Sequence, residues 1–369
     1  MATFKFPIKL YSEIVESPGC EDMILAINRN KKKHLLITGC AGSGKTTVAL
    51  LRAAKLFKDT KNDSIMFFTY NKLLREYLKN SSNEFPERNI NGLYSWLNQN
   101  LNVKESWTLN ERELKRRISY FVKQYGKFDS IIIDEGQDFP PFLYSVLLDL
   151  ANHITICADD SQIIYPNQST PESEIIKTFE PANVVLTRNY RNTKEIFNFA
   201  KYFIPEDERA KQEDSEPLNE DPDSKPVVYK LNSLEEQNQK LIDLINENKD
   251  SGNIGIAVDK NWKVKSLNKL LQNENIESCY HIGDDPIKEF KSPLIANYKS
   301  FKGLEFDIVI LPDFHESNYR ESLNDSGYSF TNKDFYVACT RAKEKLFILA
   351  HEELPEIIKT IPKELYKIK

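Results

Sequence analysis

Short apolar runs recur along the first half of the chain, and each is followed by a longer stretch with helical periodicity. These runs predict buried strands at 34–38, 64–69, 130–134, 153–158 and 183–186. Amphipathic helices are predicted at 47–59, 71–78, 93–101 and 111–125. Strands that are apolar throughout and alternate with helices predict a mostly parallel sheet with helices on both faces.

A second series of the same kind follows in the other half of the chain. Its strands are predicted at 227–229, 254–258, 294–298, 308–311 and 346–350, and its helices at 234–248, 261–272 and 334–340. Between the two series, about 205–225, Asp, Glu, Pro and Ser dominate, which predicts a surface loop. We therefore expect an α/β protein of two domains, 1–184 and 185–369, with a small insertion at about 80–128 and a cleft between the domains.

Composition narrows the class of protein without identifying it. The chain has 369 residues, of which 28% are charged and 40% hydrophobic, as in ordinary globular proteins. Its net charge of −5 excludes a general basic field, so a nucleic-acid site would have to be a local patch. The five cysteines and five histidines are scattered, which predicts a reducing compartment, no disulfides and no histidine-based metal site.

Targeting and membrane signals are not expected from the pattern. The amino terminus has no long apolar run behind it, and no segment approaches 18 consecutive apolar residues. The sequence therefore predicts a cytoplasmic protein with no membrane partner.

The stretch Gly39–Thr46 lies between a predicted strand and a predicted helix and reads Gly, four residues, Gly-Lys-Thr. In this pattern the backbone N–H groups of the loop and the start of the helix bind a polyphosphate. Lys45 is expected to reach the β- and γ-phosphates, and the Thr46 hydroxyl to ligate Mg²⁺. The remaining residues expected at the nucleotide are Gly39, Ala41, Gly42, Ser43, Gly44 and Thr47.

Further polar residues complete the chemistry that phosphoryl transfer needs. Asp134 and Glu135 end a predicted strand, where Asp134 can hold Mg²⁺ and Glu135 can deprotonate the attacking water. Gln162 can sense a γ-phosphate, although a capping amide is the alternative. Arg191 and Arg341 carry planar guanidinium groups that suit the charge of a transferring phosphoryl group, although surface salt bridges are the alternative.

Six segments in order resemble the successive motifs of superfamily-one helicases of the UvrD/Rep/PcrA type. They are 39–46, 134–138, 159–162, 189–191, 302–306 and 336–341, and the resemblance runs from about Leu36 to Leu349. It implies two RecA-like P-loop NTPase domains with ATP and Mg²⁺ in the cleft. It also implies translocation along single-stranded DNA, usually 3′ to 5′. The accessory insertions of the family are reduced, so the chain resembles a compact form.

The same resemblance implies roles for individual residues. Arg191 and Arg341 would contact the γ-phosphate, Glu305 the ribose and Tyr190 the base, and Gly303 would also belong to the nucleotide site. A nucleic-acid track would include Phe68, Tyr70, Asn71, Asn91, Tyr94, Trp96, Tyr165 and Lys299. Four of them could stack on a base, with core packing as the alternative for each, namely Phe68, Tyr94, Trp96 and Tyr165.

Together these patterns favour a compact ATP-dependent nucleic-acid motor. A nucleotide-switched regulatory ATPase, which would bind a protein or nucleic-acid partner without unwinding, is the alternative from another class. A third interpretation, an RNA translocase, differs from the DNA motor only in the polymer along which the protein moves. The sequence has no recognisable nuclease motif, so a separate nuclease or another protein is a possible partner.

Overall fold

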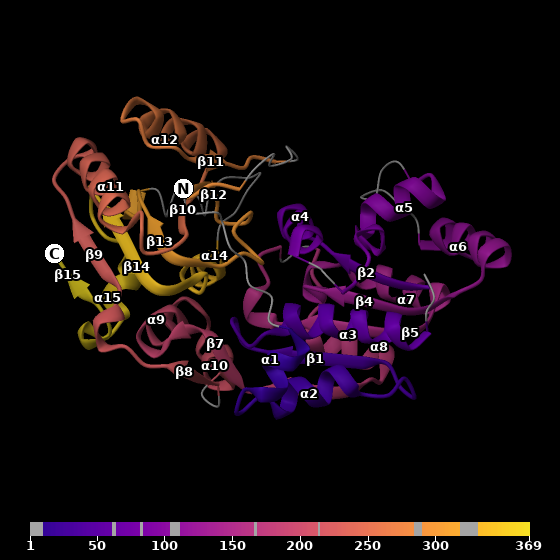
Figure 1. The fold of residues 1–369 in the computed structure, drawn as a ribbon. Helices are drawn as coiled ribbons and strands as arrows, with labels where there is room; N and C mark the ends of the chain where they lie inside the picture. The colour runs from indigo at the N-terminus through magenta and orange to yellow at the C-terminus, as the bar shows by residue number, and fades with distance from the viewer. Residues whose placement is uncertain are drawn as a thin grey trace. The chain divides into compact units, whose positions relative to one another are not determined.

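The computed structural model describes residues 10–60, 64–81, 84–103, 111–165, 168–212, 215–283, 290–317 and 331–369 (Figure 1). The chain divides into two compact units between Arg188 and Asn189. We call the described residues 10–188 the first unit and those of 189–369 the second unit.

The first unit is built on a six-stranded sheet with the order β3-β2-β4-β5-β1-β6. All neighbouring strands of this sheet are parallel. The strands are β1 (Leu35–Gly39), β2 (Ile65–Thr69), β3 (Ile90–Gly92), β4 (Phe128–Asp134), β5 (Ala151–Ala158) and β6 (Ala182–Leu186). Parallel pairing places the carboxyl ends of these strands along one edge of the sheet, where α/β proteins bind ligands.

Helices cover both faces of this sheet. They are α1 (Tyr11–Glu16), α2 (Glu21–Asn28), α3 (Lys45–Thr60), α4 (Lys72–Ser81), α5 (Leu93–Leu101), α6 (Glu111–Tyr125), α7 (Pro141–Leu150) and α8 (Glu172–Phe179). Ile154 and Ile156 of β5 pack in one core with residues of α5 to α8. Thr155, between them, accepts a hydrogen bond from Arg52 of α3. Because successive side chains of a strand point to opposite faces, α3 and the α5–α8 group lie on different sides.

The second unit contains a seven-stranded parallel sheet with the order β11-β12-β10-β13-β14-β9-β15. Its strands are β9 (Val227–Lys230), β10 (Ile254–Val258), β11 (Cys279–Tyr280), β12 (Leu294–Asn297), β13 (Phe306–Leu311), β14 (Ala342–Ala350) and β15 (Lys367–Ile368). A separate pair is formed by β7 (Arg188–Thr193) and β8 (Glu216–Asn219).

The helices of the second unit are α9 (Lys194–Ala200), α10 (Glu206–Lys211), α11 (Leu234–Asn248), α12 (Asn261–Asn273), α14 (Asn332–Cys339) and α15 (Glu356–Thr360). Apolar residues of α11 and α12 share one core with strands β10, β12, β13 and β14. Figure 1 draws α11 and α12 on one side of this sheet and α9 on the other. The expected α/β class, with two mostly parallel sheets and two RecA-like domains, is confirmed.

Two expected boundaries differ from the structure. The boundary at 184/185 falls inside β6, where Val184 is the register partner of Ile37 in β1, so the whole strand belongs to the first unit. The stretch 205–225 is not a simple loop, because its described part contains α10 and β8. No residue of α10 is buried, but three acidic residues in its first turn complement the positive end of the helix dipole. Composition alone does not reveal such a helix, since it has no apolar face.

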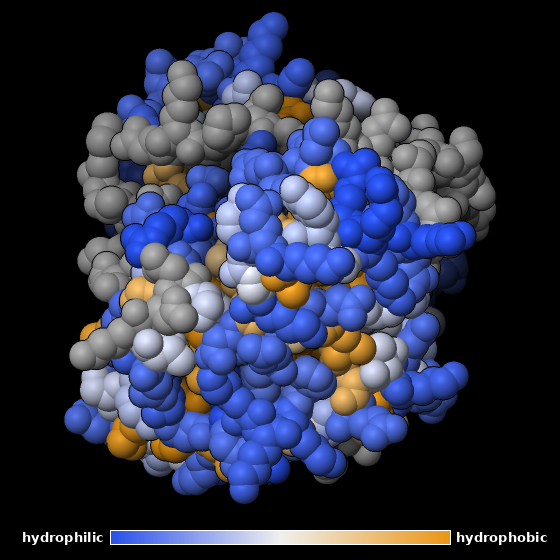
Figure 2. Space-filling model, turned by 90° about the vertical axis from the view of Figure 1, so that its right-hand side faces the viewer, coloured by the Kyte–Doolittle hydropathy of each residue, from blue (hydrophilic) through white to orange (hydrophobic). Residues whose placement is uncertain are grey.

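No helix within the described residues is long and apolar enough to cross a membrane. The face of the molecule drawn in Figure 2 is largely hydrophilic, with apolar residues in small separate patches. Isolated apolar residues on a surface are normal and do not by themselves mark a binding site.

Arg52 of α3 is a fully buried charged residue of the first unit. It is 0% exposed, its Nε donates to Thr155 Oγ1 at 2.9 Å, and its Nη1 donates to the carbonyl oxygen of Arg29 at 2.7 Å. Nη1 also donates to the carbonyl oxygens of Ala26 and Ile27. One side chain therefore ties the end of α2 to α3 and to β5.

We expect Arg52→Met to lower the free energy of unfolding by about 3 kcal/mol, because it leaves buried carbonyl groups without donors. Urea unfolding followed by circular dichroism measures this loss. Arg116→Met is the matched control, since Arg116 is a largely exposed residue of α6, and it should change stability by less than about 0.5 kcal/mol. Equal effects of the two substitutions would contradict the role given to Arg52.

Candidate functional site

The loop that follows β1 has a backbone shape that requires glycine. Gly39 has a φ of 155°, and a Cβ there would lie 2.7 Å from the carbonyl oxygen of Leu186. Gly44 has a φ of 88°, and its Cβ would lie 2.8 Å from the Met23 side chain. The chain can therefore fold tightly between β1 and α3, with its backbone N–H groups at the carboxyl edge of the sheet.

Lys45, the first residue of α3, is turned back into this loop. Its Nζ donates to the carbonyl oxygens of Gly39 at 2.7 Å and Cys40 at 2.9 Å. The same Nζ forms an ion pair with Asp159 Oδ2 at 3.2 Å. Lys45 is only 8% exposed, so these contacts satisfy an ammonium group that would otherwise be buried without partners. Thr46 and Thr47, in the first turn of α3, are partly buried.

Asp134, at the end of β4, is a buried carboxylate that is only partly satisfied. It is 1% exposed, and its Oδ2 has no hydrogen-bond partner among the described residues. Burial, together with the neighbouring charge of Glu135, raises the pKa of Asp134 to about 7, although a hydrogen bond with the Thr46 side chain opposes the shift. A hard cation prefers oxygen ligands of this kind. The residues present therefore fit Mg²⁺, which Thr46 and Asp134 would hold.

A chain of hydrogen bonds links the other polar residues of the first unit. Gln137 Nε2 donates to Glu135 Oε2 at 2.6 Å, and Gln137 Oε1 accepts from the backbone N–H of Asp159 at 3.1 Å. Gln162 Nε2 donates to Asp159 Oδ2 at 2.7 Å. Asp159 also pairs with Lys45. It therefore joins Lys45, Glu135 and Gln162 in one hydrogen-bonded network. Gln137 and Asp159 were not expected to take part, although both lie in the segments that carry the helicase resemblance.

In the second unit, Glu305 lies between two cations. Its Oε2 is 3.1 Å from Arg191 Nε, and its Oε1 is 2.9 Å from Lys343 Nζ. Burial would raise the pKa of Glu305, but Arg191 and Lys343 together hold it below the ordinary value. A ribose hydroxyl would therefore meet a carboxylate that already accepts from both cations. Lys343 was not expected here, and only the pairing of β13 with β14 brings it close.

Arg341 is a buried residue in the second unit and not a surface salt bridge. It is 2% exposed, its Nε donates to the carbonyl oxygen of Val337 at 3.0 Å, and its Nη1 donates to the carbonyl oxygen of Leu304 at 3.3 Å. Arg341 thus fixes the turn that contains Gly303, which has a φ of 82°. Tyr190, in β7, is partly buried.

Three tyrosines of the expected nucleic-acid track converge in the first unit. The Tyr70 ring lies 5.3 Å from that of Tyr165 and 6.2 Å from that of Tyr94, measured between centroids. Phe139 lies beneath them, 5.6 Å from Tyr70. All three tyrosines are partly buried, so each keeps some exposed surface. They form a compact aromatic group, which we call the tyrosine cluster.

Two aromatic residues of the expected nucleic-acid track lie in the core of the first unit. Phe68 is 0% exposed and Trp96 is 5% exposed, and their ring centroids lie 5.8 Å apart. Trp96 also packs against Phe121 of α6 at 5.3 Å. Both side chains belong to the core between the sheet and α5 to α8. Core packing, the alternative for these two residues, is therefore the correct description.

The polar residues of the track have local partners. Asn71 Oδ1 accepts from the backbone N–H of Leu74 at 3.4 Å, at the start of α4. Asn91 Nδ2 donates to the carbonyl oxygen of Arg88 at 3.0 Å. Lys299, in the second unit, is partly buried, and its charge opposes the rise that burial causes in the pKa of Asp334.

A strand, a glycine loop and a helix that present Lys45 and Thr46 beside Asp134 define a P-loop nucleotide-binding protein. Two family models match the chain, the AAA domain over residues 28–164 and the UvrD-like helicase C-terminal domain over residues 293–353. The chain is thus similar to an AAA domain followed by a UvrD-like helicase C-terminal domain, and the expected resemblance to the UvrD-type helicases is confirmed.

Two curated relatives carry helicase names. A protein of Acanthamoeba polyphaga mimivirus, named as an ATP-dependent DNA helicase, is 24% identical over 376 residues, which cover 90% of this chain and 53% of that protein. A protein of Mycoplasma capricolum, named as a DNA helicase II homologue, is 26% identical over 240 residues, which cover 62% and 30% of the two chains. The chain spans about half the length of the first relative and less of the second.

Among solved structures, the C-terminal domain of a DNA helicase from Lactobacillus plantarum is 21% identical. The match covers 48% of this chain and 98% of that domain, with a TM-score of 0.38. A likeness of this degree is too low to support a conclusion about the fold.

The raised pKa of Asp134 predicts how stability depends on pH. The folded-state pKa of about 7 lies above the ordinary value of 3.8. Folded protein therefore binds more protons than the unfolded chain between these values, and stability without metal falls as pH rises through this window. We expect Asp134→Asn to raise the free energy of unfolding at pH 8 by on the order of 1–3 kcal/mol more than at pH 5, because pH 5 lies near the start of this window and pH 8 lies beyond it.

Urea unfolding in the presence of EDTA at the two pH values measures this difference. Asp149→Asn, an exposed substitution on α7, is the matched control and should leave the pH dependence unchanged. An Asp134→Asn protein that keeps the wild-type dependence on pH would show that Asp134 does not cause it.

Proposed function

We propose that this chain is an ATP-dependent nucleic-acid motor of the UvrD-like helicase type. It couples the hydrolysis of ATP to translocation on single-stranded DNA in the 3′ to 5′ direction. The observation that carries the proposal is the network in which Asp159 joins Lys45 to Gln162 and, through Gln137, to Glu135. Two helicase names among the relatives support DNA as the polymer.

In this proposal the phosphate loop holds the nucleotide and Glu135 carries out the proton transfer. Lys45 exchanges its contacts with two loop carbonyl groups for the β- and γ-phosphate oxygens of ATP. Glu135 accepts a proton from the attacking water, while Gln137 holds one of its oxygens in place. Mg²⁺, when held by Thr46 and Asp134, supplies positive charge to the phosphate oxygens.

The second unit supplies the candidate arginines. Arg191 is bound to Glu305 by an ion pair whose side chains are 17% and 23% exposed. Such a contact can be exchanged for a phosphate oxygen, because both partners keep access to water. Arg341 is tied to two backbone carbonyl groups that would lose their donor if it moved. We therefore propose that Arg191 stabilises the transferring phosphoryl group. Arg341 would have a structural role, in which it holds the carbonyl groups of Val337 and Leu304 in place.

For the nucleic-acid track, we propose that the tyrosine cluster stacks on the bases of the single strand. Stacking of a base on an aromatic ring contributes about 1–3 kcal/mol and tolerates any base, which suits a motor that moves along any sequence. Lys299 would contribute a backbone contact from the second unit. A separate nuclease or another protein partner, which the reduced insertions favour, also belongs to this proposal.

Catalysis is tested by ATP turnover with and without single-stranded DNA. We expect Glu135→Gln to bind ATP and to lose hydrolysis by at least about a hundredfold, because it removes the proton acceptor. Lys45→Ala should lose both binding and turnover. Glu174→Gln and Lys177→Ala, on exposed positions of α8, are the matched controls and should behave like wild type.

Wild-type turnover by Glu135→Gln would remove Glu135 from the mechanism. Hydrolysis that no single-stranded nucleic acid stimulates would exclude the motor, and a nucleotide-switched regulator would then describe the protein.

The tyrosine cluster is tested by the binding of a fluorescent single-stranded oligonucleotide. Tyr70→Ala and Tyr165→Ala should each weaken binding by about 5- to 150-fold, which corresponds to the loss of ~1–3 kcal/mol of stacking. Tyr120→Ala is the matched control, since this residue of α6 is 72% exposed and lies outside the cluster. Affinity that falls equally in all three variants, or in none, would refute the cluster as the binding surface.

A further inference from the structure

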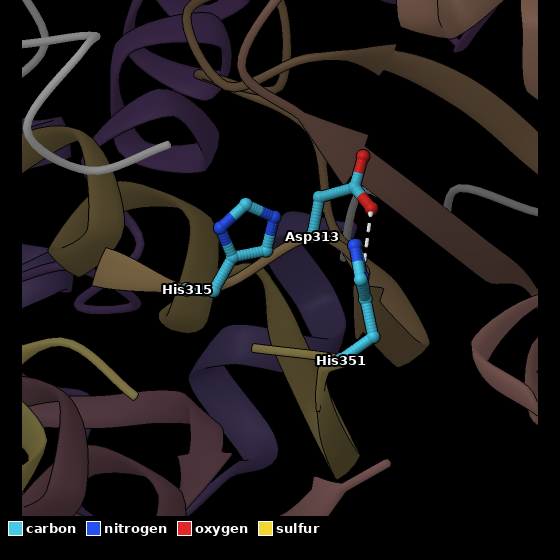
Figure 3. Close-up of side chains that lie close together, drawn as sticks. All are labelled: Asp313, His315 and His351. Atoms are coloured by element: carbon cyan, nitrogen blue, oxygen red, sulfur yellow. Dashed lines mark ion pairs between the residues drawn. The ribbon is translucent and has the colours of Figure 1, made fainter. Parts of the chain in front are cut away.

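A second group of ligand-type side chains lies in the second unit, away from every residue assigned above. Asp313, His315 and His351 each offer one donor atom, and these atoms lie within 4.8 Å of one another. Figure 3 shows the side chains of Asp313 and His351 directed toward each other, with the ring of His315 beside them. Among the described residues, this is the group of three that could hold a metal ion.

Two neighbouring strands bring these residues together. Asp313 and His315 follow the carboxyl end of β13, and His351 follows the carboxyl end of β14, its parallel partner. Backbone hydrogen bonds tie the two segments, since the N–H of Phe314 donates to the carbonyl oxygen of Leu349 at 3.0 Å. The N–H of Glu316 likewise donates to the carbonyl oxygen of Glu353 at 2.7 Å. The donors are therefore placed by the sheet and not by a single loop.

Side chains around the group hold the ligands in position. Gln237 of α11 donates from Nε2 to Asp313 Oδ1 at 2.6 Å, and its Oε1 lies 3.1 Å from His351 Nδ1. Ser317 Oγ lies 2.7 Å from His315 Nδ1. Hydrogen-bonded partners of this kind orient imidazole and carboxylate ligands in metal sites.

Charge around the group favours a cation. Asp313 shares the ammonium of Lys263 with Asp259, at 3.1 Å and 2.9 Å. Glu352 adds a further carboxylate, with Oε2 3.5 Å from His315 Nδ1 and Oε1 3.9 Å from His351 Nε2. Three carboxylates and one ammonium leave a formal charge of −2 beside two imidazoles.

We propose that Asp313, His315 and His351 bind a divalent transition-metal ion of the Zn²⁺ type, with Glu352 at its open side. Two imidazoles and a carboxylate are a ligand set that Zn²⁺ takes in proteins, whereas Mg²⁺ and Ca²⁺ prefer oxygen ligands alone. Bonds of about 2.0–2.1 Å require donors roughly 3.3 Å apart in a tetrahedron, so the donors move inward by on the order of an ångström on binding.

The ion would link the segment after β13, through Asp313 and His315, to the segment after β14, through His351. These strands begin next to Glu305 and Arg341, so the ion braces the pair of strands that also carries the second unit's expected nucleotide residues. The proposal does not depend on the proposed motor function, because its ligands bind the ion whatever the chain does with ATP.

Zn²⁺ alone is the probe, added to untagged protein that has been stripped with EDTA and dialysed. Isothermal titration should show one Zn²⁺ per chain with micromolar or tighter affinity, and Zn²⁺ should raise the midpoint of thermal unfolding. His315→Gln and His351→Gln should each weaken binding by more than about tenfold. Glu353→Gln is the matched control, since it removes an exposed carboxylate of the same segment and should leave binding unchanged.

Stripped wild-type protein that takes up no Zn²⁺ would overturn the proposal, and so would histidine variants that bind as tightly as wild type. Co²⁺ added to wild-type protein gives a test that needs no variant. A visible absorption band of four-coordinate Co²⁺ supports the site, and the spectrum of the free aquo ion alone refutes it.

Discussion

The buried ion pair between Lys45 and Asp159 is the contact on which the first unit's site depends. Lys45 begins the helix after the phosphate loop, whereas Asp159 follows β5, the strand next to β1. A single carboxylate therefore holds the lysine and also accepts from Gln162. Because buried charges are costly without partners, the loop, the sheet and the polar network stabilise one another or fail together.

Burial of the polar residues of this site also has a cost in free energy, at the end of β4. Asp134 keeps a carboxylate oxygen with no hydrogen bond from any residue that the structure describes, and Glu135 next to it has a left-handed backbone with a φ of 55°. Both features cost free energy in the absence of a ligand. If Thr46 and Asp134 hold a cation as proposed, its charge would remove the electrostatic part of that cost. In that proposal, cation binding and the free energy of unfolding would be coupled at the end of β4.

In the second unit, pairing between strands replaces the single buried ion pair as the organising contact. β13 and β14 begin beside Glu305 and Arg341 and end beside Asp313 and His351. The register of two strands therefore positions polar groups at both ends of the sheet. Lys343 reaches Glu305 for the same reason, since the carboxylate precedes β13 and the lysine lies near the start of β14.

Local patterns in the sequence determined the elements and the phosphate loop. Residues 93–101 and 111–125 form helices with the bounds that periodicity predicts, because each turn of such a helix depends on neighbours in the chain. The glycines of the loop and the acids at the end of β4 are likewise fixed by short-range backbone geometry. Resemblance to a family then assigned the motifs in both halves.

Only the tertiary structure decided which side chains face the core and which distant residues meet. Phe68 and Tyr70 are two residues apart, yet one is buried and the other joins the tyrosine cluster. His315 and His351 are remote in sequence, and their rings lie 4.8 Å apart only because β13 pairs with β14. Burial and convergence depend on how strands and helices pack, and no local pattern of residues encodes that packing.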